Sequence, residues 1–371
     1  MFSPAHGGGF NTYNQNILNG ILLQDNNQYY IFTNRLLINK FSIPDYGNIH
    51  LIGLSDKISK TIPRQFWIQI LLPVYLLYKK IDVLFSPTNI SPFLLVFTKI
   101  RVLLVHHTNL PWLFPRDVPG RKINLFFQKL FIKLSFIASN IIIVDSITAK
   151  NELIKLFPKI ENKIKTILLG VDNHRFSKNH NFSKKDDDIF YEEYFLTISG
   201  AVKYHCLIEL LSAYEKFRDQ YSLAPKFLLI SKKLDKKYFE KVQNYIINSR
   251  FSKDIILKDD VDYELIPQFY NNAKLYIFSS YCEVFGLTNL EAMCCGIPVL
   301  TAKESALPEI CGDAAIYFDP KNPDDICNKI VKVYFDEKLK KELVFKGKNQ
   351  IIKYSWENTC KKTRELLLNL N

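Results

Sequence analysis

Short apolar and β-branched runs alternate along this chain with longer stretches of helical periodicity. Runs of four to seven such residues that end in polar or turn residues are typical of buried parallel strands. Helical patterns lie between them, as at 121–138 and at 146–157, which begins with Ser or Thr caps. In the first half we therefore expect parallel strands at 29–34, 82–87, 102–107, 140–146 and 165–170.

The alternation stops in a polar, charged segment, "SKNHNFSKKDDDIFYEEY", and then begins again. Two such series predict an α/β protein with two facing, doubly wound, Rossmann-like domains, whose ligand lies beyond the carboxyl ends of the strands. We expect the domains at 1–172 and 194–354, joined by a linker at 173–193. The second series predicts strands at 194–199, 226–231, 253–259, 273–280, 297–302 and 314–319.

Composition narrows the classes of partner and compartment. The 371 residues are 47% hydrophobic and carry a net charge of +12, which favours nucleic acid, an anionic membrane surface or phosphorylated substrates. The seven cysteines form no CxxC pair, so we expect no zinc site and no disulfide framework, as in a reduced cytosolic protein. The N-terminus lacks a signal-peptide pattern. The most apolar run, 66–78, is too short for a membrane span of about 20 residues.

The stretch "CEVFGLTNLEAMCCGIPVL", 282–300, is the strongest candidate site. Glu283 lies on a loop after a strand, and Glu291 is expected on the first turn of the next helix, with Thr288 as its N-cap. Carboxylates flanking a helix N-terminus suit a ligand with hydroxyls at both ends and phosphate between them. A purely structural alternative is a Thr288–Glu291 capping box beside an ordinary loop acid. Backbone N–H groups for the phosphates would come from Phe285, Gly286, Leu287 and Thr288.

A family resemblance extends this interpretation. The segment "SSYCEVFGLTNLEAMCCGIPVLTAKESALPEICGDAAIYFDP" closely resembles the E-x7-E region of retaining family-4 glycosyltransferases, the mannosyltransferase-like group 1 transferases with the GT-B fold. The segments "PQFYNNAKLYIFSS" and "GVDNHRF" resemble other parts of that family. The segment "KYSWENTCKKTRELL" resembles its closing helix, so we expect 355–371 to return to the N-terminal domain.

The resemblance implies roles for individual residues. Glu283 would hold hydroxyls of the transferred sugar, and Glu291 would hold the ribose. His106, at a strand end, aligns best with a family histidine close to the transferred sugar, whereas His107 stands where another polar residue is more usual. Gly8 and Gly9 resemble the family's Gly-Gly loop, which follows a central first strand. Only "MFSPA" precedes "HGGG", so we expect that strand to be absent or to be encoded upstream, as an apolar segment of roughly 8–12 residues.

The chain departs from the family pattern at the donor phosphate loop. The usual Arg and Lys are replaced at Gly200 or Ala201 and at His205, so Lys203, assisted by protonated His205, is the candidate phosphate cation. Val284 replaces a usual glycine. These differences keep a catalytically reduced member possible.

The resulting prediction is a metal-independent glycosyltransferase without a cofactor. It would move a hexose-type sugar, with retention, from a GDP- or UDP-sugar to a saccharide or lipid-linked hydroxyl acceptor in surface polysaccharide or glycolipid assembly. We expect a cytoplasmic protein that is either free or peripheral on the inner face of the cell membrane. The alternatives are a catalytically reduced subunit that binds a partner or lipid, and a nucleotide-sugar epimerase on the same fold.

Two segments, 64–80 and 121–136, combine apolar residues with Arg and Lys. They are either core-facing helices with a solvated basic face or a surface that docks on anionic lipid. No nucleic-acid-binding module is recognisable, so we expect no nucleic acid partner.

Overall fold

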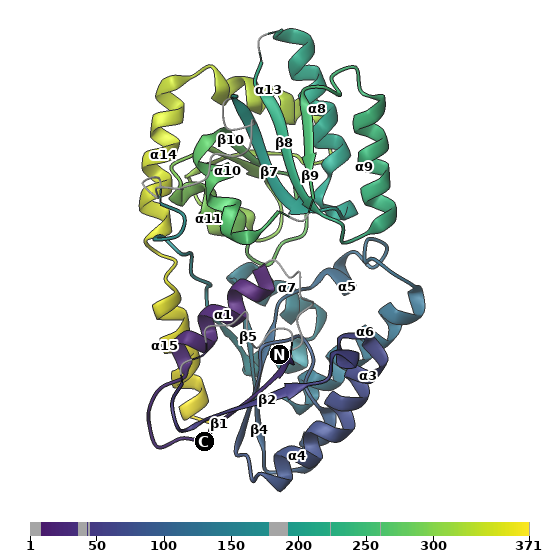
Figure 1. The fold of residues 1–371 in the computed structure, drawn as a ribbon, viewed down its shortest axis with the longest axis vertical. Helices are drawn as coiled ribbons and strands as arrows, with labels where there is room; N and C mark the ends of the chain where they lie inside the picture. The colour runs from purple at the N-terminus through teal and green to yellow at the C-terminus, as the bar shows by residue number, and fades with distance from the viewer. Residues whose placement is uncertain are drawn as a thin grey trace. The chain divides into compact units, whose positions relative to one another are not determined.

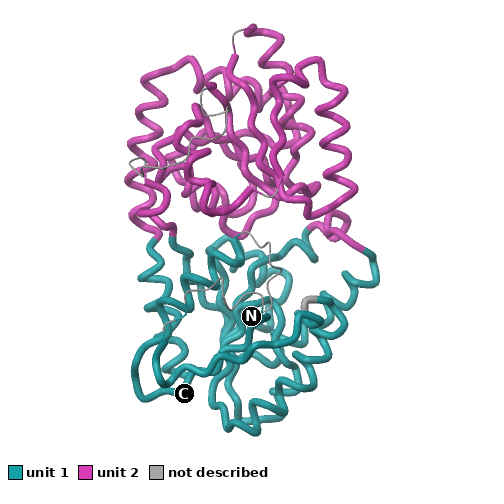
Figure 2. The backbone as a smooth tube through the Cα atoms, viewed as in Figure 1, with its two compact units in different colours: residues 1–113, 121–170, 355–371 teal, residues 114–120, 171–354 magenta. Residues whose placement is uncertain are grey.

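The structure is a computed structural model that describes residues 9–35, 43, 45–177, 192–222, 224–259 and 261–370. Figure 2 shows its two compact units. Unit 1 comprises residues 1–113, 121–170 and 355–371, and unit 2 comprises residues 114–120 and 171–354. The chain thus enters unit 2 twice before the closing segment, and the short piece at 114–120 is a crossing that the hydrophobic pattern did not indicate.

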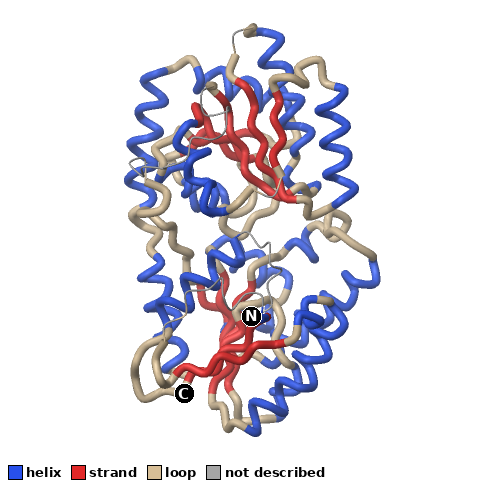
Figure 3. The backbone as a smooth tube through the Cα atoms, viewed as in Figure 1, coloured by secondary structure: helices blue, strands red, loops and turns tan. Residues whose placement is uncertain are grey.

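Unit 2 is built on a six-stranded parallel sheet, red in the upper part of Figure 3, with the order β12-β11-β10-β7-β8-β9. The chain runs outward from β7 to β9 and then returns to β10 on the other side of β7. The neighbours β7 and β10 therefore form the topological switch point, where ligands bind in open α/β sheets. The strands are β7 (Tyr194–Gly200), β8 (Lys226–Lys232), β9 (Ile255–Lys258), β10 (Ala273–Phe278), β11 (Val299–Ala302) and β12 (Ala315–Phe318).

Helices connect these strands and cover the sheet (Figure 1). Phe195, Phe227 and Tyr276 are fully buried on central strands, which explains why those segments read as continuous apolar runs. The helices of unit 2 are η6 (Lys203–His205), α8 (Leu207–Gln220), α9 (Lys236–Asn248), η7 (Tyr263–Leu265), α10 (Ile266–Asn272), α11 (Leu287–Cys294), α12 (Leu307–Cys311), α13 (Pro323–Tyr334) and α14 (Glu337–Ile351).

Unit 1 contains two separate parallel sheets, one of four strands in chain order and one of two strands. All eleven strands expected from the sequence are present in the two units, with ends shifted by up to four residues. The strand β2 was missed because its residues are half-buried or exposed and lack a buried apolar run. The strands are β1 (Tyr29–Asn34) and β2 (Ile49–Leu54), and β3 (Val83–Ser86), β4 (Arg101–His106), β5 (Ile141–Val144) and β6 (Ile164–Thr166).

The helices of unit 1 include the closing helix of the chain. As the sequence predicts, Ser146 caps α7, and its hydroxyl accepts a hydrogen bond from the Ala149 N–H at 3.0 Å. The helices are α1 (Gly9–Ile21), η1 (Asp56–Ser59), α3 (Thr61–Phe66), η2 (Trp67–Leu71), α4 (Leu72–Tyr78), η3 (Phe93–Phe97), α5 (Leu110–Leu113), α6 (Lys122–Ala138), α7 (Ile147–Leu156), η4 (Pro158–Lys163) and α15 (Trp356–Leu368).

The closing helix α15 packs on α1 within unit 1. A Cβ at Gly20 would lie 2.2 Å from the Cys360 sulfur, so the close approach of the two helices requires glycine at that position. Arg364 also pairs with Asp25 at 2.9 Å. These contacts attach the end of the chain to its beginning.

A cavity of about 540 Å³ separates the two sheets of unit 1. Tyr29–Phe32 of β1 line one side of it and Val83–Ser86 of β3 line another, together with apolar residues of α1 and α4.

Candidate functional site in unit 2

The carboxyl ends of strands β7 and β10, at the switch point, bring Glu283 and His205 together. Glu283 follows β10 and His205 follows β7, and the Glu283 Oε1 atom lies 3.2 Å from the His205 Nε2 atom. Because β7 and β10 are adjacent strands, residues 78 positions apart meet at one edge of the sheet. The Glu283 carboxylate is partly exposed, whereas the backbone oxygen of Glu283 accepts a hydrogen bond from the Ser305 hydroxyl at 2.7 Å. The loop is therefore held while its carboxylate remains accessible.

Both ring nitrogens of His205 face oxygen atoms. Its Nδ1 atom lies 2.5 Å from the backbone oxygen of Gly200, and Nε2 faces the Glu283 carboxylate. The ring packs edge-on against Tyr204 at 4.5 Å between centroids. His205 is thus held between the end of β7 and the Glu283 loop.

The N-terminus of α11 lies directly after the Glu283 loop. Its N-cap is Gly286, with φ +84°, so the expected Thr288 cap is wrong and Thr288 is the second helical residue. A Cβ at Gly286 would also lie 2.4 Å from the Leu307 side chain. This position therefore needs glycine both for its backbone conformation and for space. The Phe285 side chain is buried against Tyr354, so its ring is part of the core of unit 2.

Glu291 lies on the second turn of α11, not the first, and makes no capping box. Its carboxylate accepts hydrogen bonds from the Tyr270 hydroxyl at 3.1 Å and the Tyr263 hydroxyl at 3.3 Å. It is only 4% exposed, and burial raises its pKa to about 7 against the lowering effect of the two tyrosines. The hydrogen-bond partners of Glu291 therefore lie outside its own helix, so Glu291 does not serve as a helix cap.

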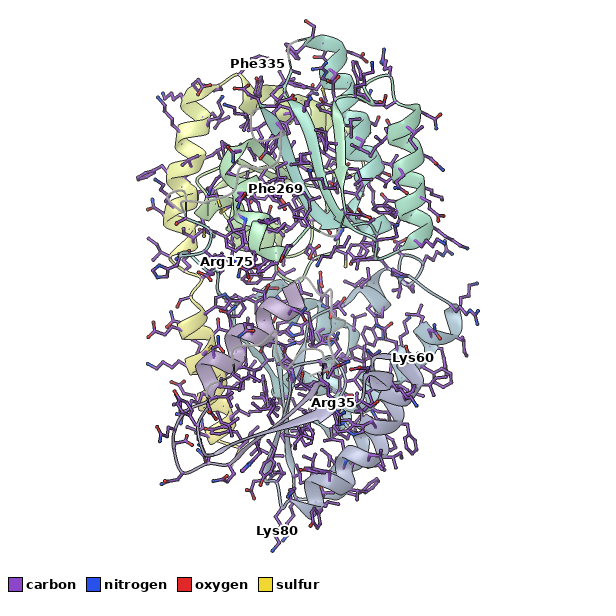
Figure 4. All side chains as sticks on the ribbon, viewed as in Figure 1. Arg35, Lys60, Lys80, Arg175, Phe269 and Phe335 are labelled. Atoms are coloured by element: carbon purple, nitrogen blue, oxygen red, sulfur yellow. The ribbon has the colours of Figure 1, made fainter. Side chains whose placement is uncertain are left out.

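Two tyrosines that the sequence analysis did not select therefore belong to this site. Arg175, labelled in Figure 4, lies over the Tyr263 ring at 4.3 Å and pairs with Glu264 at 2.7 Å. Nothing in the local pattern distinguishes Tyr263 and Tyr270 from core aromatics, and only their hydrogen bonds to Glu291, from η7 and α10, single them out.

Lys203 is paired in the structure. Its ammonium lies 2.7 Å from the Asp117 carboxylate, which also accepts a hydrogen bond from Tyr281 at 2.6 Å. Desolvation opposes ionisation of Asp117, but hydrogen bonds from Lys203 and Tyr281 hold its pKa below the usual value. The Lys203 side chain is 65% exposed, so this pair can open. A second cation, Lys321, lies over the Tyr281 ring at 4.6 Å, and neither Asp117 nor Lys321 stood out in the sequence.

His106, in unit 1, is not placed to act on a ligand. It is 1% exposed, packs on Phe136 at 5.0 Å between centroids, and has its pKa lowered to about 3 by burial. The following residue points to the opposite face of the strand. His107 bonds through Nδ1 to the buried Asp145 at 2.8 Å and retains some exposure. Of the two histidines, His106 is thus the buried one and His107 the one with an exposed fraction.

The remaining candidate residues from the sequence are Gly8 and Gly9. Gly8 lies outside the described residues, and Gly9 begins α1 with open space where its Cβ would be, so no contact there demands glycine. Within the described residues no group of three or more His, Cys, Asp or Glu could hold a metal ion. In the same part of the chain, every helix is too short or too polar to cross a membrane.

Comparison with solved structures shows which fold the chain has. The HepE protein of Anabaena, solved with UDP and glucose, aligns over 98% of this chain and 97% of its own, with a TM-score of 0.73 and 14% identity. Sucrose-phosphate synthase of Thermosynechococcus elongatus aligns over 98% and 94%, with a TM-score of 0.72 and 17% identity. The chain is thus an α/β protein with parallel sheets and the GT-B fold, as the sequence predicts.

The sequence of unit 2 also matches a family model. Residues 177–350 match the profile of the group 1 glycosyl transferases. O-antigen chain mannosyltransferase B of Escherichia coli is 36% identical over 100 residues, which are 27% of this chain and 26% of that protein. An uncharacterized glycosyltransferase of Methanocaldococcus jannaschii is 27% identical over 60% of this chain and 58% of its own length. The chain thus spans about a quarter of the length of the first relative and under two thirds of the length of the second.

Proposed function

We propose that the chain is a glycosyltransferase that moves a hexose-type sugar from a nucleotide-sugar donor to a hydroxyl acceptor with retention. The observation that carries the proposal is the juxtaposition of the Glu283–His205 pair with the N-terminus of α11 at the β7–β10 switch point. The group 1 segment that surrounds these residues supports it. No metal or cofactor is part of the proposal.

The donor diphosphate would lie at the N-terminus of α11, where the free N–H groups and the helix dipole favour negative charge. His205 lies next to Glu283, at the same end of the sheet. As the bond to the transferred sugar breaks, charge grows on the departing diphosphate, and fixed N–H groups and cations stabilise that state more than the ground state. Lys203 becomes available to the diphosphate when its bond to Asp117 opens.

The two carboxylates would hold the two ends of the donor. Glu283 accepts hydrogen bonds from hydroxyls of the transferred sugar, and its contact with His205 holds it in place. Glu291 accepts hydrogen bonds from the ribose, in exchange for those of Tyr263 and Tyr270. His107, held by Asp145, replaces His106 as the histidine of unit 1 that we assign to the reaction.

For the substrates, we propose a mannosyl donor, GDP-mannose first, because several curated relatives carry the name mannosyltransferase. A UDP-sugar is the second choice, since the HepE structure holds UDP and glucose. The acceptor would be a saccharide or a lipid-linked hydroxyl in O-antigen-like surface polysaccharide assembly on the cytoplasmic side of the membrane.

The test is a binding and turnover panel of GDP- and UDP-sugars, with and without lipid-linked saccharide acceptors. Calorimetry would measure donor binding, and released GDP or UDP would measure turnover. We expect Glu283→Ala to abolish acceptor-dependent turnover, while the matched control Glu240→Ala, an acid on α9 of the same unit, behaves like wild type.

Three outcomes would contradict the proposal. Failure to bind any donor, with Glu283→Ala indistinguishable from wild type, would indicate a subunit that binds a partner or lipid. Interconversion of donor sugars without an acceptor would indicate an epimerase. A product with inverted anomeric configuration, determined by NMR, would remove retention alone.

A further inference from the structure

One surface of unit 1 exposes an unusual number of large apolar side chains. It comprises three segments, 60–80, 93–101 and 121–138, which we call the α3–α6 face. Fourteen of the 24 exposed large apolar side chains among the described residues lie on it. They are Ile62, Phe66, Ile70, Leu71, Val74, Leu77, Tyr78, Val96, Phe97, Ile123, Phe126, Phe127, Leu130 and Ile137. Single exposed apolar residues are ordinary, whereas a concentration of this kind marks an interaction surface.

The charge of the α3–α6 face has one sign. Its three segments contain ten Lys or Arg residues and no Asp or Glu. Lys60 and Lys80, both labelled in Figure 4, lie immediately before α3 and shortly after α4. Lys99, Arg101 and Lys122 are also exposed. Exposed acids, Asp56 and Asp82, lie only beyond the two ends of the segment 60–80. An apolar surface whose own segments carry only positive charge is complementary to an apolar layer covered by negative charge.

The three segments form one fixed layer, with α3, α4 and α6 along the same flank of unit 1 in Figure 1. Two buried polar side chains, Gln69 and Ser135, hold it together through backbone groups of the loop before η3. The Ser91 N–H donates to the Ser135 hydroxyl of α6 at 2.8 Å, and the Phe93 N–H donates to the Gln69 side-chain oxygen of η2 at 3.0 Å. The Gln69 amide donates in turn to the Ser91 backbone oxygen at 3.3 Å. The exposed side chains are therefore presented by a pre-formed surface.

We propose that the α3–α6 face docks on an anionic lipid bilayer. Apolar side chains on the exposed sides of α3, η2, α4 and α6 would enter the boundary between headgroups and acyl chains, and the lysines and arginines would contact lipid phosphates. The absence of any acid in these segments favours a uniformly anionic surface over a protein partner, whose charges are usually mixed. The docking itself does not depend on the proposed function. That it brings the enzyme to an acceptor carried on lipid does rest on the proposed function.

The test is flotation of the full chain with vesicles of phosphatidylcholine, alone or mixed with phosphatidylglycerol. Wild type should float with the mixed vesicles, weakly with the neutral ones, and less as salt is added. Phe97→Ser with Phe126→Ser should lower the partition constant at least tenfold. Lys99→Gln with Lys122→Gln should lower it about fivefold for each charge.

Matched controls come from surfaces outside the face. Phe345→Ser with Ile352→Ser removes side chains that are 66% and 74% exposed, comparable to Phe97 at 82% and Phe126 at 59%. Lys361→Gln with Lys362→Gln removes two exposed charges of α15. Both controls should float like wild type, and circular dichroism of every variant checks that it is folded.

Failure of wild type to float, or equal loss in the face and control variants, would overturn the inference. So would a dimer that dissociates in the face variant, seen by analytical ultracentrifugation, because the occupant would then be a second copy. Calorimetric titration with the nucleotide-sugar panel distinguishes the two proposals, since face variants should bind donor unchanged. Donor binding without flotation would leave the proposed function standing, and flotation without donor binding would leave the docking standing.

Discussion

Replacing the buried Glu291 by Gln should make the stability of unit 2 less sensitive to pH. Glu291 has a folded-state pKa of about 7 against an ordinary value of 4.5, chiefly because burial disfavours its charged form. Because the folded state binds the Glu291 proton more tightly, protonation stabilises it. This stabilisation is complete below pH 4.5 and is lost as the pH rises through 7. At about 1.4 kcal/mol per pKa unit, wild type should lose roughly 3 kcal/mol between pH 4.5 and pH 8 relative to Glu291→Gln.

Urea unfolding at a series of pH values measures this difference. Trp67, Trp112 and Trp356 all belong to unit 1, so tryptophan fluorescence follows unit 1 and far-ultraviolet circular dichroism follows both units. The difference between Glu291→Gln and wild type should grow with pH in circular dichroism and not in fluorescence. Glu240→Gln, at an exposed site on α9, is the control and should show no such trend.

The reasoning would be refuted if Glu291→Gln and wild type kept a constant difference in the free energy of unfolding from pH 4.5 to pH 8. A difference that shrank with rising pH would mean that the tyrosine hydrogen bonds outweigh burial and stabilise the carboxylate. Either outcome would remove the raised pKa from the description of this site.

Three further predictions concern single positions. Glu283→Gln and His205→Gln should each lower donor affinity about tenfold or more, and the double variant should lose less than the sum, with a coupling of about 1 kcal/mol by calorimetric titration; additive losses would show that the contact is incidental. Gly286→Ala should destabilise unit 2 by about 2 kcal/mol in urea unfolding, because φ is +84° and Leu307 occupies the Cβ position; an unchanged midpoint would contradict this. His106→Gln should remove the loss of unit 1 stability below about pH 6.5 in fluorescence-detected unfolding. The reason is that a pKa of about 3 leaves the folded ring neutral there while the unfolded ring gains a proton. His107→Gln should instead lower turnover at unchanged stability, and the reverse pattern would assign the reaction to His106.

Local sequence patterns were sufficient to predict most of the secondary structure and the position of Glu283. Apolar runs predicted eleven of the twelve strands, because a strand buried on both faces needs apolar residues at every position. The strand β2 lacks that requirement and was missed. The position of Glu283 on a loop after a strand also followed from residue order alone.

Details of helix capping were less accessible. Thr288 has the residue type of an N-cap, but the positive φ of Gly286 places the cap two residues earlier, which moves Glu291 to the second turn. Residue preference alone does not distinguish these two starts, since both are compatible with the same apolar pattern.

Contacts between distant residues needed the tertiary structure. The order of strands in the sheet made β7 and β10 neighbours and thereby paired His205 with Glu283. Hydrogen bonds from Tyr263 of η7 and Tyr270 of α10 reach the buried Glu291 of α11, which a sequence pattern does not specify. The sequence favoured His106 over His107, whereas the fold buries the His106 ring and leaves His107 partly exposed beside Asp145. Local periodicity is a property of neighbouring residues, whereas adjacency, burial and charge pairing arise only when the whole chain has folded.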